Sequence, residues 1–67
     1  MNRILKYFSY EHLPPNLQAV SKPLSELAHK MDEELPECAE KTVGLRKLLE
    51  AKDAFVRAAL ETSTTGE

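Results

Sequence analysis

The sequence predicts an all-α protein, an antiparallel two-helix hairpin preceded by an irregular aromatic N-terminal arm. Apolar residues recur three and four positions apart in two stretches, which is the spacing of amphipathic helices. The segment LPECAEKT, residues 35–42, interrupts the pattern with a proline. Three of the four aromatic residues fall before the first stretch. We therefore expect an arm at residues 1–15, a helical hairpin at 16–61 and a flexible tail at 62–67.

The first helix is expected from about Asn16 to Leu35. Pro23 lies inside it, so either a short turn precedes a main helix capped by Ser21, or the helix kinks at the proline. Its apolar residues fall within an arc of about 100°, a narrow stripe. They are Leu17, Val20, Leu24, Leu27, Ala28, Met31 and Leu35.

The second helix is expected from about Cys38 or Ala39 to about Glu61, and its apolar arc is wider, at about 200°. Small residues recur in it every seven positions, and large apolar residues lie beside them. The row consists of Gly44, Ala51 and Ala58, beside Leu48 and Phe55. A narrow stripe covers only part of a wide arc, and the small row permits close approach of another backbone. The mismatch predicts self-association through the second helix.

Lys52 projects within this apolar arc, where an unpaired ammonium would be costly to bury. In one interpretation its stem packs while its charged end reaches solvent or a carboxylate of a neighbouring helix. In the other, Lys52 is a cation placed for an anionic ligand.

Composition narrows the function classes. The chain has 67 residues and a net charge of −2, which argues against binding polymeric nucleic acid by charge alone. No apolar run approaches the roughly 20 residues that span a bilayer, and one cysteine allows no intramolecular disulfide. His12 and His29 lack local ligand partners, so we expect no metal site and no cofactor. No nucleophile or phosphate-cradling glycine loop is recognisable, and we expect no enzymatic activity.

The arm sequence YFSYEHLPP, residues 7–15, has two interpretations. Tyr7, Phe8 and Tyr10 could fasten the arm across the hairpin and fill its open end. Alternatively, one ring could stack on a flat ligand whose charge meets Lys22, His12 or an arginine.

The order of motifs resembles the helical hairpin domain of the phage anti-CBASS and anti-Thoeris sponge proteins. That family opens on F-x-Y-H-x-P and continues through a first helix, a proline-marked turn and a second helix reading roughly E-x-S-L-A-L-x-K-L-E-E-A. The resemblance covers about residues 8–60. Departures include Glu11 between Tyr10 and His12, Ser21 near a basic position, and Pro23. The matching residues are Phe8, Tyr10, Pro14, Gln18, Pro36, Glu40, Thr42, Val43, Gly44, Leu45, Lys47, Leu48, Glu50 and Ala51.

This resemblance implies a protein that sequesters cyclic di- or trinucleotide messengers without cleaving them and so blocks CBASS-type antiviral signalling. It implies a homo-oligomer, a dimer or larger and up to a hexamer, with ligand pockets between protomers, acting in the cytoplasm of the infected bacterial host cell. Tyr10 would stack on a base, Lys22 or Ser21 would lie near phosphate, and Thr42 would offer a hydroxyl where backbone N–H groups receive phosphate. The ligand-binding residues expected are Phe8, Tyr10, His12, Ser21, Lys22, Lys41, Thr42, Arg46 and Lys52.

The alternative function is that of a small oligomeric helical adaptor. In that interpretation the wide apolar face of the second helix binds a partner protein, and the arm is structural. The sponge needs aromatic and basic side chains that converge on a pocket, whereas the adaptor needs an uncovered apolar groove.

Overall fold

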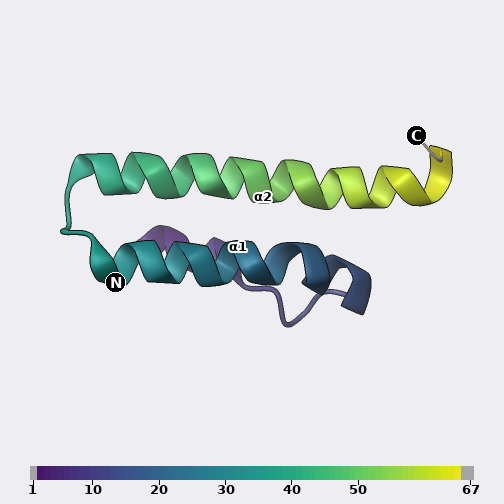
Figure 1. Ribbon diagram of the computed structural model, residues 1–67, viewed down its shortest axis with the longest axis horizontal. Coiled ribbons are helices and arrows are strands. Elements are labelled where there is room, and N and C mark those ends of the chain that lie inside the picture. Colours follow the sequence, from purple (N-terminus) through teal and green to yellow (C-terminus); the bar gives the residue numbers. More distant parts are fainter. Residues whose placement is uncertain (1, 66–67) are drawn as a thin grey trace.

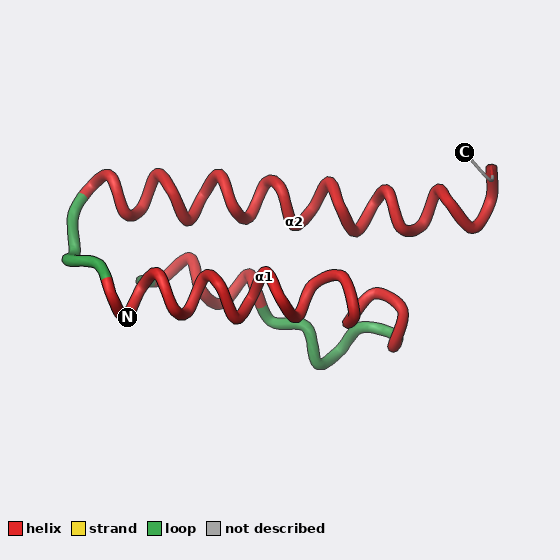
Figure 2. The backbone as a smooth tube through the Cα atoms, viewed as in Figure 1, coloured by secondary structure: helices red, strands yellow, loops and turns green. Residues whose placement is uncertain are grey.

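The computed structural model describes the backbone of residues 2–65 and the side chains of residues 2–61. The elements follow in the order η1 (Arg3–Phe8), α1 (Pro15–Glu34) and α2 (Ala39–Thr65). The two long helices lie side by side and are joined at one end by a short connection, while η1 packs against both of them (Figure 1). A longer loop, residues 9–14, returns the chain from η1 to the start of α1 (Figure 2). The prediction of an all-helical chain with two paired long helices is confirmed.

The N-terminal arm is more regular than the sequence interpretation allowed, because it contains the 3₁₀ helix η1. Asn2 caps this helix: its side-chain oxygen accepts a hydrogen bond from the backbone N–H of Ile4 at 3.1 Å. Residues three apart lie on the same side of a 3₁₀ helix, so Leu5 and Phe8 both point into the core. η1 is thereby a third packing element rather than an irregular extension.

Helix α1 runs without interruption through Pro23, so the expected short turn capped by Ser21 is not formed. It begins at Pro15, a position where the missing proline N–H costs nothing because that donor would be unpaired anyway. Pro23 is exposed, so the backbone carbonyl that it leaves without a helical partner lies on the wet side of the helix.

The buried face of α1 differs from the stripe that the spacing predicted. Leu17 and Ala28 are buried as expected, but Ser21 and Ser25 are buried with them, whereas Leu27 and Leu35 are exposed. At 100° per residue the buried face is displaced by roughly 60° from the centre of the stripe. The displacement follows from η1, because Leu5 and Phe8 fill the space above small side chains that a larger residue would block.

Lys41 fastens the connection between α1 and α2. Its ammonium donates to the backbone carbonyls of Asp32 at 3.0 Å and Leu35 at 3.2 Å, which are orphan acceptors at the end of α1. It also forms ion pairs with the Asp32 carboxylate, at 3.0 Å, and with Glu37. The backbone N–H of Asn2 donates to the same Asp32 carboxylate at 3.2 Å, so one cluster connects all three helices.

Helix α2 extends to Thr65, beyond the end expected at Glu61, so most of the predicted tail is helical in its backbone. Residues 66–67 of that predicted tail lie outside the described residues. Leu45, at 2% exposure, is the residue that α2 contributes to the hydrophobic cluster, and Leu48 and Leu49 pack against that cluster. Val43 and Phe55 remain exposed on this helix, so its apolar arc is only partly covered within one chain.

Candidate functional site

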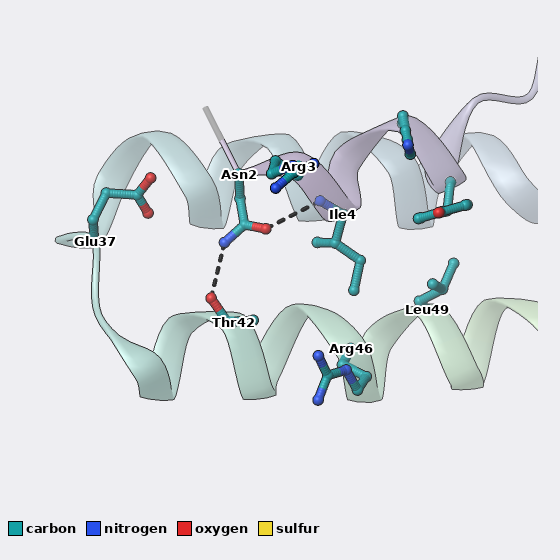
Figure 3. A pocket seen from close by; sticks show the side chains of 9 residues that line it. Asn2, Arg3, Ile4, Glu37, Thr42, Arg46 and Leu49 are labelled. Carbon is teal, nitrogen blue, oxygen red and sulfur yellow. Dashed lines mark hydrogen bonds between the residues drawn. The ribbon is translucent and has the colours of Figure 1, made fainter.

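A groove lies between η1 and the first half of α2, and we call it the basic groove. It has a volume of about 740 Å³. Arg3 and Lys6 enter it from η1 and Arg46 from α2. Figure 3 shows Ile4 and Leu49 pointing into the space between the two elements. The remaining lining residues are Asn2, Tyr7, Glu37 and Thr42.

One hydrogen bond fixes the width of the groove at its end. The Asn2 side-chain amide donates to the Thr42 hydroxyl at 3.0 Å, while its oxygen holds the N–H of Ile4 (Figure 3). The Asn2 side chain therefore caps η1 and at the same time bridges η1 to α2. The Thr42 hydroxyl accepts this bond and keeps its own hydrogen to donate.

Tyr7 is the aromatic side chain of the basic groove, and the sequence interpretation did not select it. Tyr7 as a whole residue is 55% exposed, and the Lys6 ammonium lies 5.2 Å from its ring centroid. An exposed ring with a cation over it offers both a stacking surface and a positive charge to one ligand. The missed signal is the three-residue spacing of Leu5 and Phe8, which turns Tyr7 away from the core.

A second hollow, of about 460 Å³, continues the basic groove along α2, and Lys6 and Tyr7 line both. It adds Lys52, Arg57 and His12. Asp53 also lines it and pairs with Lys52 at 3.0 Å. This ion pair agrees with the interpretation in which the Lys52 ammonium meets a carboxylate. The carboxylate belongs to the same helix, however, and not to a neighbouring one.

Positive charge is concentrated along this side of the molecule. The two hollows together contain Arg3, Lys6, Arg46, Lys52 and Arg57, which are five of the nine Lys and Arg residues of a chain with net charge −2. The basic groove has one lining carboxylate, Glu37, and that group is paired with Lys41. The arrangement is suited to an anion with separated charges.

Lys41 was expected to contact ligand, and the structure gives it a different task. It is buried, at 6% exposure, and its ammonium contacts Asp32 and Leu35 at the end of α1 and Glu37 in the connection. The hydrogen bond to Glu37 and the one to Asp32 raise the pKa of Lys41, and the Lys41 hydrogen bond lowers the pKa of Asp32. A ligand anion would have to displace these partners, so Lys41 is a structural clasp.

Phe8 and Ser21 were also expected to bind ligand, and the structure contradicts this. Both are fully buried, so neither can touch a ligand without leaving the core. Phe8 fills the centre of the hydrophobic cluster, and the Ser21 hydroxyl is enclosed without a hydrogen-bond partner. The arm therefore divides its aromatic residues: one fastens it to the long helices, and Tyr7 faces outward.

Tyr10 lies apart from the basic groove. It lines a hollow of about 520 Å³ beside α1, together with the carboxylates of Glu11, Glu26 and Glu33, with His29, and with Lys30, which is paired with Glu34. Hydrogen bonds from its own backbone N–H and from Ser9 lower the pKa of Glu11, so this carboxylate is charged at neutral pH. Within one chain these carboxylates oppose a phosphate beside Tyr10. Its predicted stacking role stays a prediction, tied to pockets shared between protomers.

The other predicted residues are divided between surfaces. Thr42 and Arg46 lie together in the basic groove, and His12 and Lys52 share the adjoining hollow. Lys22 is exposed on α1, outside both. The Thr42 backbone N–H donates to the Cys38 carbonyl at 3.3 Å, so its hydroxyl, and not its amide, faces a prospective ligand.

Within residues 2–65, no three His, Cys, Asp or Glu side chains come together as a metal site requires. Neither long helix, over the part of the chain described, combines the length and apolarity needed to cross a bilayer. No protein family model, curated protein or solved structure matches the chain.

Proposed function

We propose that this protein binds and sequesters a cyclic oligonucleotide messenger, a cyclic di- or trinucleotide, without cleaving it. The observation that carries the proposal is the basic groove, which Arg3, Lys6 and Arg46 line together with the exposed Tyr7. Binding of such a messenger in an infected bacterial cell would block CBASS-type antiviral signalling, the role implied by the family resemblance.

The chemistry of a cyclic oligonucleotide fits this groove. Its bases present flat faces that stack on a tyrosine, and its ring carries two or three phosphates that need cations at separate positions. Arginine binds phosphate oxygens through paired N–H donors, and the groove has one arginine on each wall. The Thr42 hydroxyl, held by Asn2, adds a neutral donor at the end of the groove.

Self-association belongs to the same proposal. The messenger-binding unit is a homo-oligomer, a dimer or larger, in which α2 lies at the contact between copies. The exposed Val43 and Phe55 of α2 and Leu27 of α1 support this, because a second copy would remove them from water. In such an assembly Tyr10 and Lys22 could join a ligand pocket from a neighbouring copy.

The proposal is tested by calorimetric titration of the purified protein with a cyclic dinucleotide and, separately, a cyclic trinucleotide. Arg46→Ala removes a cation of the basic groove, and we expect affinity to fall by about 10- to 100-fold, the value of a hydrogen bond to a charged group. Lys47→Ala is the matched control, because Lys47 is an exposed cation on the same helix that does not line the groove.

Raised salt should weaken binding less in Arg46→Ala than in the wild type, because one phosphate contact has been lost. Equal affinities of the two variants and the wild type would place the ligand elsewhere. Absence of binding by the wild-type protein to either class of messenger would refute the sponge function itself.

A second candidate function is a helical adaptor that binds a partner protein. The exposed Leu27 of α1, Leu35 directly after that helix and Phe55 of α2 favour it. The Arg46→Ala variant distinguishes the two candidates. An adaptor that binds through its apolar face should keep its affinity for the partner protein in this variant, whereas a sponge should lose affinity for the cyclic messenger.

A further inference from the structure

We propose that α2 carries a self-complementary row of four residues, Gly44, Leu48, Ala51 and Phe55, through which two copies of the chain pair antiparallel. The inference deepens the self-association proposed above by naming its contact, and it does not depend on the identity of the ligand. Gly44 and Leu48 line a hollow to which η1 contributes no residue, and the helical period places Ala51 and Phe55 on the same face of α2.

The spacing of the row is the same when it is read in either direction along the chain. Its residues are separated by four, three and four positions, and they alternate small, large, small, large. A two-fold axis across the middle of the row reverses the order, so Gly44 of one copy meets Phe55 of the other, and Leu48 meets Ala51. Both small positions then receive a large side chain, as an isologous interface requires.

The surroundings of Gly44 provide the space for a ring. A Cβ placed on Gly44 would meet no atom within 4 Å. An apolar hollow of about 270 Å³ opens there, lined chiefly by Leu27, Met31 and Leu48. Phe55, whose side chain is 54% exposed, is the aromatic residue available on α2 to fill it. A ring inserted in this hollow would contact both long helices and the glycine backbone.

The area available is sufficient for a stable dimer. A standard protein interface takes about 800 Å² from each partner. The molecule measures 41 × 20 × 15 Å, so one broad face offers roughly this area. The total surface of the chain is 4783 Å², of which such a contact is about one sixth. A second copy of the chain is therefore an occupant of the right size and shape.

The test exchanges the ring and the glycine. Gly44→Phe places a ring against the partner's ring, and Phe55→Ala leaves the hollow unfilled. Each single variant should raise the dimer dissociation constant by at least about tenfold, measured by sedimentation velocity across a concentration series. The double variant Gly44→Phe/Phe55→Ala restores a ring opposite a small residue. It should associate with an affinity within about threefold of the wild type.

Glu50→Phe is the matched control, since it adds a ring to an exposed position of α2 outside the row. Its association should equal that of the wild type. Gly44 and Phe55 are exposed in the chain, so the variants should keep the helical content of the wild type by circular dichroism. A wild-type protein that remains monomeric would overturn the interface, with ligand binding tested separately through Arg46→Ala. If the wild type dimerises but neither single variant weakens the dimer, the pairing of these residues is wrong. The same holds if the single variants weaken the dimer and the double variant does not regain the wild-type affinity. In both cases self-association itself still stands.

Discussion

Gly44→Ala should have opposite effects on folding and on association. Gly44 lies inside α2, five residues after its first residue, and its added methyl group would meet open space within the chain. Alanine exceeds glycine in helix propensity by about 1 kcal/mol at such a position. For a domain of this size, about 1 kcal/mol raises the melting temperature by about 4–8 °C.

The dimer responds in the other direction. In the paired arrangement Gly44 faces Phe55 of the second copy, so each of two symmetric contacts would be overpacked. Overpacking costs about 1–3 kcal/mol at a site. Two sites at the lower value raise the dissociation constant by about 30-fold. Self-association should weaken although the isolated chain becomes more stable.

Thermal melts followed by circular dichroism at low protein concentration measure the first effect, and sedimentation velocity measures the second. Ala54→Gly is the reverse control, because Ala54 is exposed on α2 outside the row. It should lower the melting temperature by a similar amount and leave association unchanged. If Gly44→Ala raised stability and left association unchanged, the close approach at Gly44 would be refuted. A fall in melting temperature at low concentration would refute the open space around it.

Four further predictions concern the core, the clasp and the ligand. Phe8→Ala should destabilise the chain by about 3–5 kcal/mol in urea denaturation, because Phe8 is fully buried. Ser21→Ala should stabilise it by about 1–3 kcal/mol, since it removes an enclosed hydroxyl without a partner. The pKa of Asp32 is lowered in the folded chain, so its ionised carboxylate stabilises the fold at pH values above 3.8, the ordinary pKa. This contribution should be lost as the pH falls from 3.8 through the lowered pKa, and Asp32→Asn should flatten that part of the acid melting curve. If the protein sequesters its ligand as proposed, a bound cyclic messenger should be recovered intact by chromatography after heat denaturation of the protein.

Contrary results are specific to each prediction. Phe8→Ala with wild-type stability and lost ligand affinity would return Phe8 to the binding site. A destabilised Ser21→Ala would mean that the hydroxyl has a partner in the folded protein. An acid melting curve that Asp32→Asn leaves unchanged would assign the acid sensitivity to other carboxylates. Linearised messenger, absent from a control without protein, would indicate a nuclease.

The sequence by itself determined the helical class and the position of the break between the long helices. Pro36 removes a helical hydrogen bond and disfavours helical geometry at Leu35, and the apolar spacing on either side of it has the period of an α-helix, so both signals are local. Thr42 and Arg46 were also selected from sequence, and they lie together in the basic groove. What a chain segment does within a few turns is set by its own residues, so the sequence interpretation succeeded for the two long helices and the break between them.

Tertiary structure decided which faces are buried. Helical periodicity identifies an apolar stripe but cannot show that a third element will pack beside it, so Leu27 was expected inside and Ser21 near a ligand. Leu5 and Phe8 reverse this, because a short 3₁₀ helix packs against α1 and joins its Ala28 in the core. The groove that contains Tyr7 exists only because η1 lies against α2, a contact between residues about 40 positions apart.

Lys41 shows the same limit in electrostatics. From sequence it is a lysine near the start of a helix, available to an anion. In the fold its ammonium meets the carbonyl groups at the end of α1 and the carboxylate of Asp32, nine residues earlier. The turn between the helices brings these groups together, and a buried ammonium requires such partners. The sequence determined which charges the chain carries, and only the packing of three helices decided which of them are paired inside and which line the open groove.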